Sequence, residues 1–339
     1  MSGTAALPER VVVIGAGTMG ARIALSFAKA GSQVCATSRR ESTLRAAEEV
    51  LLNELDSIRP KRRPRVLFEG TSRTNSQVTG RGSIDLRSSA DEELGSADLV
   101  IETVRENLSD KLAVLGHVQR FCRPDAIVTT NTSSLNLFDL ELAITPPGRF
   151  AGLHWFHPAD LIQLVEVVPA SSTEDATLET LGRWMSGIDK TPVILKEAVP
   201  GFIANRLQYA LLREAYSLVI AGVCSFSDVD NAVTAGLGPR WAALGPFQCM
   251  DFAGLDVHLA VAKLLFADLA CDRVAPKELE DLVDEGHLGV KSGFGLGGQY
   301  SPEQARGLAN LRDEMLHRVA DFRRSWEEGI GQSVEEGRE

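Results

Sequence analysis

The sequence has few cysteines, and none of them lie in a pattern that marks a disulfide framework or a metal site. Its five cysteines are scattered along 339 residues without a Cys-x-x-Cys pair. Small disulfide-rich secreted folds and zinc-binding folds depend on regularly spaced cysteines, so neither class is indicated. We expect no metal site, and scattered thiols favour a reducing, cytoplasmic compartment.

The sequence also lacks an excess of positive charge. Lys and Arg number 35 against 46 Asp and Glu, which gives a formal net charge of -11. A nucleic-acid binder presents a basic face to its ligand. The charge balance therefore favours a small-molecule partner over a nucleic acid.

Neither a membrane span nor a secretion signal is evident. No apolar run approaches the ~18 residues that a spanning helix needs. Residues 1–10 do not combine a charged start with an apolar core, as a signal peptide would. We therefore expect no membrane partner.

What the sequence does contain is a change of pattern near residue 198. At 339 residues the chain exceeds the size at which one core usually keeps growing, so we expect two domains. Before residue 198, short apolar runs alternate with helical periodicity, and after it we find helices and almost no strands. We predict a doubly wound α/β sheet of the Rossmann type over residues 1–198, an all-α domain over 199–325, and a charged, frayed tail over 326–339.

Two segments carry more specific expectations. Residues 60–89 combine a basic cluster with a polar stretch of loop composition, which indicates an insertion or a mobile arm. Residues 247–269 are so uniformly apolar that they predict one buried helix.

The strongest local motif is a glycine-rich turn between the first apolar strand and the first helix. In it, Gly15 makes the tight turn, Gly17 lets the backbone approach a pyrophosphate, and Gly20 packs the helix against the strand. The helix that begins at Thr18 and Met19 offers amide donors to the anion. Glycine turns also serve plain packing, but the flanking strand and helix favour a dinucleotide site.

The residue that ends the second strand discriminates between NAD and NADP. An acid normally stands there when the cofactor is NAD, because it accepts from the ribose hydroxyls. Here the position is Ser38, followed by Arg39 and Arg40. A serine and two guanidinium groups suit a 2'-phosphate, so we expect NADP(H), with NAD(H) as the alternative if both arginines are only solvated surface charges.

A histidine and a glutamate stand on successive predicted strands. His154 lies where a strand leaves the sheet at its cofactor-bearing edge, and Glu166 lies twelve residues later inside an apolar strand, where an unpaired carboxylate would be costly to bury. A carboxylate bonded to one imidazole nitrogen orients the ring and makes the other nitrogen a general base. The pair is a candidate catalytic dyad, although a histidine at a strand end is also often structural.

Two further polar segments are weaker candidates. Asn131 and Ser133 follow an apolar strand on a loop at the same edge, and Asn205 opens the second domain. Each of these is also a plausible helix cap.

Together these segments resemble the 3-hydroxyacyl-CoA dehydrogenase family, and the match runs from about residue 10 to residue 290. Further matching motifs are Glu106-Asn107-Leu108 with Lys111, Asn131-Thr132-Ser133-Ser134, Gly152-Leu153-His154, Pro200-Gly201-Phe202-Ile203 with Asn205-Arg206, and Gly245-Pro246-Phe247.

The resemblance implies a role for each matching residue. His154 would be the catalytic base, Glu166 would orient it, and Ser133 and Asn205 would hold the substrate oxygen. Glu106 and Lys111, with Asn131, would line the cofactor site. The helical domain would form a homodimer.

The sequence departs from the family at three places. His157 stands where the family usually has an asparagine, three residues after the catalytic histidine. Ser38 replaces the acid after the second strand, and residues 293–298 differ from the usual end of the second domain. Arg240 and its surroundings look more like relatives that act on small acids without CoA, such as L-gulonate, carnitine and pyridine-carboxylate dehydrogenases and lambda-crystallin. His157 and Arg240 are therefore candidate substrate residues.

These observations favour an oxidoreductase that transfers hydride between a nicotinamide cofactor and a 3-hydroxyacyl or 3-oxoacyl thioester. The first alternative keeps the chemistry and changes the substrate to a CoA-free hydroxy acid or alcohol. The second is a non-catalytic, crystallin-like binding protein, which the joint presence of His154, Glu166, Ser133 and Asn205 argues against.

Overall fold

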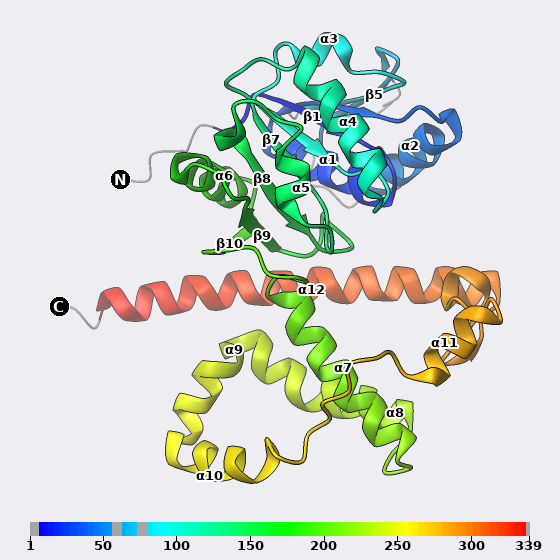
Figure 1. Ribbon diagram of the computed structural model, residues 1–339, viewed down its shortest axis with the longest axis vertical. Coiled ribbons are helices and arrows are strands. Elements are labelled where there is room, and N and C mark those ends of the chain that lie inside the picture. The colour runs from blue at the N-terminus through cyan, green and yellow to red at the C-terminus, as the bar shows by residue number, and fades with distance from the viewer. Residues whose placement is uncertain (1–6, 56–62, 73–80, 337–339) are drawn as a thin grey trace. The chain divides into compact units, whose positions relative to one another are not determined.

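The first strand, β1 (Arg10–Ile14), lies inside a ten-stranded sheet because its residues are apolar on both faces. Val11 and Val13 enter one hydrophobic core while Val12 enters the other, on the opposite face. Strands that are buried on both faces are typical of parallel sheets covered by helices. The computed structural model describes residues 7–55, 63–72 and 81–336 (Figure 1).

The sheet is mostly parallel, with antiparallel pairs at β8–β9 and β3–β4. In space its order is β10-β9-β8-β7-β6-β1-β2-β5-β3-β4. The remaining strands are β2 (Gln33–Thr37), β3 (Arg65–Phe68), β4 (Thr71–Ser72), β5 (Ser83–Arg87), β6 (Leu99–Glu102), β7 (Ile127–Thr130), β8 (Phe150–Trp155), β9 (Leu164–Pro169) and β10 (Thr191–Ile194).

Helices cover both faces of this sheet, as Figure 1 shows. α1 and α6 pack on the core that contains Val11, whereas α4 and α5 pack on the core that contains Val12. The helices are α1 (Thr18–Ala30), α2 (Glu41–Leu55), α3 (Asp91–Leu94), α4 (Leu108–Phe121), α5 (Leu137–Glu141) and α6 (Asp175–Gly187), with a 3-10 turn at Pro147–Arg149.

The order of the strands reverses beside β1. The chain passes from β1 to β2 on one side and later returns to place β6 on the other. In open α/β sheets, ligands bind outside the carboxyl ends of the strands at such a reversal. The carboxyl ends of β1, β6, β7 and β8 are therefore where a site is expected.

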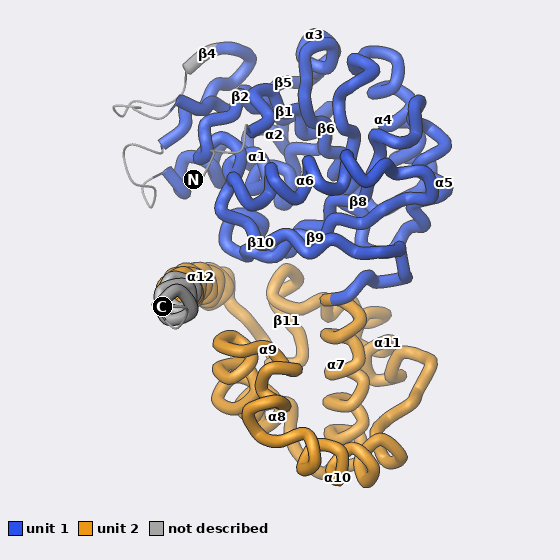
Figure 2. The backbone as a smooth tube through the Cα atoms, turned by 90° about the vertical axis from the view of Figure 1, so that its left-hand side faces the viewer, with its two compact units in different colours: residues 1–203 blue, residues 204–339 orange. Residues whose placement is uncertain are grey.

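The chain divides into two compact units, residues 1–203 and 204–339 (Figure 2). The second unit consists of helices with one small hairpin, so the predicted fold class, a Rossmann-type sheet followed by an all-α domain, is confirmed. Its elements are α7 (Ala204–Ile220), α8 (Phe226–Ala232), a π-helical turn (Val233–Leu237), α9 (Gly238–Ala253), α10 (Leu255–Leu265), α11 (Lys277–Asp284), a 3-10 turn (Val290–Ser292), β11 (Phe294–Gly295), β12 (Gly298–Gln299) and α12 (Pro302–Glu336).

The prediction of an insertion or mobile arm over residues 60–89 is wrong for the part that the structure describes, because β3 and β5 are strands of the main sheet. Val66 and Phe68 alternate with less buried neighbours, and so do Ile84 and Leu86. This alternation spans only a few residues, and the surrounding polar residues obscured it. Lys61 and Arg62 of the basic cluster lie outside the described residues.

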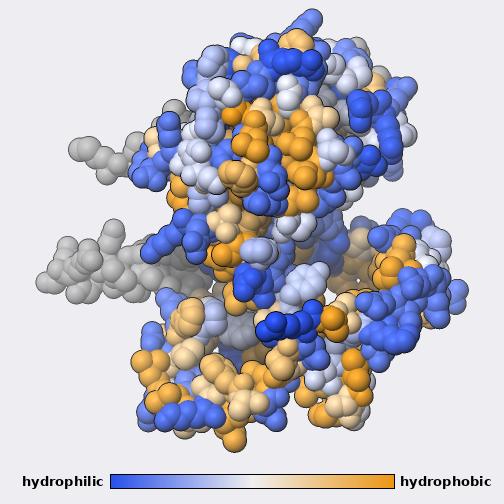
Figure 3. Space-filling model, viewed as in Figure 1, coloured by the Kyte–Doolittle hydropathy of each residue, from blue (hydrophilic) through white to orange (hydrophobic). Residues whose placement is uncertain are grey.

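The single buried helix expected over residues 247–269 was also wrong. A kink at Gly245 (φ 72°) lies just before this segment, and Gly254 (φ 99°) divides the segment between α9 and α10. Phe247 is 79% exposed and Phe252 is 81% exposed. The apolarity of a helix predicts that one of its faces will be covered, but it does not predict which chain covers that face. Figure 3 shows other apolar side chains at the surface as well.

Residues 326–336 also differ from the expected frayed tail, because α12 continues to Glu336. Glutamate recurs in this segment and is a good helix former, so charge did not prevent helix formation. None of the helices in the described residues combines the length and apolarity needed to cross a membrane.

Candidate active site

The glycine turn has the geometry that a dinucleotide cradle requires. Gly15 has φ +110°, and a Cβ there would lie 2.7 Å from the Thr103 carbonyl oxygen. A Cβ on Gly20 would lie only 2.0 Å from the Gly15 carbonyl oxygen, whereas a Cβ on Gly17 would meet nothing within 4 Å. Gly15 and Gly20 are thus required by packing, while the open space at Gly17 is free for a ligand.

The N-terminus of α1 lies at this open space. Its N-cap is Gly17, which has no side chain to accept from the helix amides, and its first turn contains no acid. First-turn amides without an internal acceptor, together with the helix dipole, favour an anion. Thr18 is exposed and Met19 is half-buried, so the turn fits the pyrophosphate of a dinucleotide.

Ser38, Arg39 and Arg40 follow β2 directly, with both arginines exposed. Ser38 Oγ accepts from the Arg40 amide at 3.2 Å, and the Arg40 carbonyl accepts from the amides of Thr43 and Leu44 at the start of α2. This segment places two guanidinium groups and no carboxylate at the end of β2.

His154 and Glu166 face each other across the antiparallel pair β8–β9. His154 Nδ1 and Glu166 Oε2 are 2.7 Å apart, and the residues are 5% and 1% exposed. The second carboxylate oxygen, Oε1, accepts from the Ile203 amide at 2.9 Å. The structure therefore brings the predicted dyad together and holds both oxygens of Glu166.

Two aromatic rings hold the imidazole from its sides, and sequence reasoning did not identify either as a site residue. The centroid of the His154 ring lies 4.5 Å from that of Phe156 and 5.3 Å from that of Phe202, both in edge-to-face geometry. Phe202 has φ 51° in the turn that follows Gly201. With Nδ1 bonded to Glu166, these contacts leave Nε2 as the nitrogen that can exchange a proton with a substrate.

Glu106 organises the loop after β7. Its Oε1 accepts from the Ser133 amide at 3.0 Å, from the Ser134 amide and hydroxyl at 3.0 Å each, and from Thr132 Oγ1 at 2.5 Å. Partial burial opposes ionisation, but the bond from Thr132, the charge of Lys111 and the bonds from Ser134 and Ser133 outweigh it and lower the pKa of Glu106. The carboxylate therefore stays charged at neutral pH.

Lys111 does not line an open site, which corrects the expectation for that residue. Its side chain is fully buried, and Nζ lies 2.9 and 3.0 Å from the two oxygens of Glu102 and 3.5 Å from Glu106 Oε2. Sequence reasoning missed Glu102, although a glutamate that ends an apolar strand needs a cation nearby. Lys111 thus supports Glu106 from beneath.

Asn131 ties the end of β7 to the residue after His154. Its Oδ1 accepts from the Trp155 amide at 2.9 Å. Ser133 is half-buried on the same loop, and its amide is held by Glu106. The loop of Asn131 and Ser133 and the dyad therefore share one edge of the sheet.

The remaining candidates lie elsewhere. His157 is exposed on the loop after β8. Asn205 belongs to α7 and Arg240 to α9, in the second unit, so they are not among the residues that the first unit assembles.

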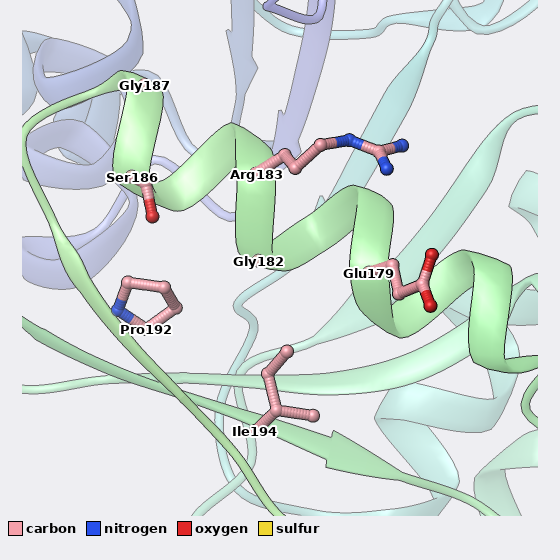
Figure 4. Close-up of a pocket in the computed structure, with 7 residues that line it drawn as sticks. All are labelled: Glu179, Gly182, Arg183, Ser186, Gly187, Pro192 and Ile194. Atoms are coloured by element: carbon pink, nitrogen blue, oxygen red, sulfur yellow. The ribbon is translucent and has the colours of Figure 1, made fainter. Parts of the chain in front are cut away.

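A metal site, or a pocket away from this edge, would be an alternative ligand site in the described residues. No group of three metal-binding side chains occurs in the part of the chain that the structure describes. An open pocket of about 640 Å³ lies between α6 and β10, with Arg183 and Ile194 in its lining (Figure 4), but it contains none of the candidate site residues.

Comparison with known proteins assigns both units of the chain to one family. Residues 10–198 match the family model of the 3-hydroxyacyl-CoA dehydrogenase NAD binding domain, and residues 201–297 match that of its C-terminal domain. The chain is 36% identical to 5-formyl-3-hydroxy-2-methylpyridine 4-carboxylate 5-dehydrogenase of Mesorhizobium japonicum, over 91% of this chain and 96% of that protein. It is 30% identical to 3-hydroxybutyryl-CoA dehydrogenase of Clostridioides difficile, over 84% of this chain and 98% of that protein.

A solved structure shows the same relationship. The crystal structure of a 5-formyl-3-hydroxy-2-methylpyridine 4-carboxylic acid 5-dehydrogenase, described as an NAD+ dependent dismutase, superposes with a TM-score of 0.80 at 33% identity. The similarity covers 94% of this chain and 98% of that one. The likeness therefore extends over both units.

Proposed function

This chain belongs to the 3-hydroxyacyl-CoA dehydrogenase family of nicotinamide-dependent oxidoreductases, and we propose that it interconverts the hydroxyl and carbonyl groups of a 3-hydroxyacyl or 3-oxoacyl thioester. The observation that carries the proposal is the buried His154–Glu166 pair, with 2.7 Å between Nδ1 and Oε2. It lies on the same sheet edge as the open glycine turn. A base beside a dinucleotide cradle is what alcohol oxidation requires.

In this mechanism the dyad handles the proton. When bound, a nicotinamide supplies the hydride acceptor or donor. During oxidation, Nε2 of His154 removes the proton of the substrate hydroxyl, and Glu166 holds the imidazole through Nδ1 and stabilises the imidazolium that forms. During reduction, the same nitrogen returns the proton to the carbonyl oxygen.

The substrate oxygen needs a donor on the opposite side from His154. By resemblance to the family we assign this role to Ser133 and Asn205. Glu106 accepts from the amide of Ser133, and the buried ammonium of Lys111, which is paired with Glu102, lies 3.5 Å from Glu106 Oε2. These buried partners keep the loop in one position, which is what preorganised catalysis requires.

A CoA-free hydroxy acid or alcohol is the second candidate substrate. It is favoured by the similarity to pyridine-carboxylate dehydrogenases, which spans nearly the whole chain. His157, exposed on the loop after β8, and Arg240, exposed on α9, would then recognise a polar ring and a free carboxylate. A purely crystallin-like role is disfavoured because the buried dyad occurs together with the open glycine turn and with Ser133 and Asn205, which a passive protein does not need in combination.

We propose NAD(H) as the cofactor, which corrects the expectation of NADP(H). The matching family model is that of an NAD binding domain, and the superposed dehydrogenase is described as NAD+ dependent. NADP(H) remains the second candidate because Ser38, Arg39 and Arg40 supply two exposed guanidinium groups and no carboxylate after β2.

One kinetic screen tests both substrate and cofactor. The consumption of NADH and of NADPH is followed by fluorescence with acetoacetyl-CoA, with free keto acids, and with a formylpyridine carboxylate. We expect NADH to be consumed fastest with acetoacetyl-CoA. Turnover only with the free acids or the pyridine selects the second candidate substrate, faster use of NADPH overturns the cofactor assignment, and no turnover with any substrate refutes an oxidoreductase of this class.

We further propose that the protein is a homodimer held by the helical unit. Phe247 and Phe252 of α9 are 79% and 81% exposed, and Leu264 of α10 is 73% exposed. A surface with many large apolar side chains usually marks an interface. α12 also carries a series of exposed apolar residues at helical spacing: Leu308, Leu311, Met315, Val319 and Phe322.

The dimer is tested by light scattering after gel filtration. The wild type is expected at twice the chain mass of 36.6 kDa, and Phe252→Asp is expected to shift it toward the monomer because a buried unpaired carboxylate is costly. Leu142→Asp is the control, since Leu142 is 71% exposed in the first unit and should leave the mass unchanged. A monomeric wild type would refute the proposal.

We also propose a reducing compartment such as the cytoplasm. All five cysteines are free, and structural disulfides are rare in reducing compartments.

A further inference from the structure

One loop connects the two members of the dyad. Residues 156–163 leave β8 just after His154 and enter β9 two residues before Glu166; we call this segment the dyad loop. Its middle is a turn in which the amides of Leu161 and Ile162 donate to the Pro158 carbonyl at 3.1 and 3.0 Å. The dyad loop is therefore continuous with the ends of both strands that carry the dyad.

A buried lysine anchors the dyad loop from beneath. Lys190 precedes β10 and is only 7% exposed. Its Nζ donates to the carbonyl of Ala159 at 2.6 Å and to that of Ile162 at 2.8 Å, and it lies 5.5 Å from the centroid of the Trp155 ring. One ammonium therefore holds both ends of the turn and contacts the residue next to His154.

An ion pair also connects the dyad loop to α1. Asp160 has a fully buried side chain, and its Oδ1 lies 2.6 Å from an Arg22 guanidinium nitrogen. Arg22 is on α1, whose N-terminus is at the glycine turn, and it also pairs with Glu54 of α2 at 3.2 Å. The dyad loop is thus attached to the helix whose first turn lies at the cradle.

The charges around Lys190 do not remove the cost of burying it. Burial lowers the pKa of Lys190 to about 8, while Asp160 and Asp189 raise it and Lys29 of α1 lowers it further. An apolar side chain of the same length would avoid this desolvation. A costly buried cation that donates to two loop carbonyls points to a need for a fixed loop.

We propose that Lys190 is a positioning residue for the dehydrogenase reaction: its buried ammonium fixes the dyad loop and thereby the alignment of His154 with substrate. The inference rests on the proposed function for its catalytic consequence and on the contacts above for its structural part. Lys190 touches neither substrate nor cofactor in this role. It acts through the carbonyls of Ala159 and Ile162.

Lys190→Met tests the proposal, with kinetics on the substrate that the wild type turns over. Methionine keeps the length and removes the donors, so we expect kcat to fall between about 10- and 100-fold, as small misplacements of reacting groups do. The KM for the dinucleotide should stay within twofold, because the glycine turn is untouched. Lys196→Met, an exposed lysine just after β10, is the matched control and should leave kcat unchanged.

The pH profile separates positioning from a general loss of structure. The profile is measured in the oxidation direction, where His154 acts as the base and does not have to supply a proton. Lys190 loses its proton as pH rises through about 8, so the anchor weakens on the alkaline side and wild-type kcat for oxidation should fall there. The Lys190→Met variant has no such group and should lack this fall. An unchanged kcat in the variant, or the same alkaline fall in both proteins, would overturn the proposal.

Hydrogen exchange tests the anchor without any turnover. In Lys190→Met the amides of Leu161 and Ile162 should exchange at least tenfold faster than in the wild type, with other strands of the sheet unaffected. If the variant does not fold, the wild type itself is compared at pH 7 and pH 9 after correction for intrinsic exchange, and the same amides should lose protection. Unchanged protection refutes the anchor even if the screen detects no substrate, so the two failures are distinguishable.

Discussion

Replacement of His154 by alanine is expected to lower kcat by about 10²- to 10⁴-fold, the usual contribution of a general acid–base residue. The Kd for the dinucleotide should stay within about twofold. The reason is geometric: in the proposed mechanism His154 exchanges a proton with the substrate oxygen, whereas the proposed site of the dinucleotide pyrophosphate is at Gly17 and the N-terminus of α1. Stopped-flow turnover and fluorescence titration with NADH measure the two quantities on the same protein.

Glu166→Gln provides the matched variant for the dyad. The amide keeps the shape, and its oxygen can still accept from the Ile203 amide. Its NH2 group then faces His154 Nδ1 as a donor, which places the imidazole proton on Nε2, and the amide also lacks the charge that stabilises the imidazolium. We therefore expect a loss of kcat that approaches that of His154→Ala, with an unchanged Kd. Turnover of His154→Ala at the wild-type rate would refute the role of the dyad, and a parallel loss of dinucleotide binding would show that His154 maintains the fold instead.

The second large effect is expected at the glycine turn. Substitution of Gly20 should reduce the stability of the fold, whereas substitution of Gly17 should reduce the affinity for the dinucleotide. A Cβ on Gly20 would lie 2.0 Å from the Gly15 carbonyl oxygen, so Gly20→Ala must displace backbone and should lower the free energy of unfolding by about 3 kcal/mol or more. Gly17 has φ -75° and open space around its Cβ position. Gly17→Ala should therefore change that free energy by less than about 1 kcal/mol.

For the affinity for NADH, in contrast, the larger effect is expected at Gly17. The space beside Gly17 is where the backbone would approach a pyrophosphate, so the methyl group of Gly17→Ala should raise the Kd for NADH at least tenfold in a fully folded protein. Urea unfolding and NADH titration measure both effects. A Gly17→Ala variant with wild-type affinity would show that the pyrophosphate binds elsewhere, and a Gly20→Ala variant of wild-type stability would show that the turn relaxes freely.

Some corrections have a common physical origin. Residues 65–68 and 83–87 form strands although they lie in polar surroundings, and the apolar residues 247–269 form two helices with exposed faces. Local composition reports how much apolar surface a segment carries. It does not report which other segment, or which other molecule, covers that surface.

The sequence alone determined the elements whose signals are local. Apolar strands, the helical period and the spacing of Gly15, Gly17 and Gly20 predicted the Rossmann sheet and the cradle, because each depends on neighbours within a few residues. The acidic charge also pointed to a small-molecule partner, and the scattered cysteines pointed away from a disulfide framework or a zinc site. His154 and Glu166 could be proposed as a pair only through their positions on successive strands.

Only the tertiary structure decided which side chains meet. The antiparallel register of β8 and β9 sets His154 opposite Glu166, and a shift of one residue would have placed the two on opposite faces. The same holds for Glu102 with Lys111 and for Lys190 beneath the dyad loop. These partners are buried charges from separate elements, and a sequence shows the charge but not the partner that compensates it.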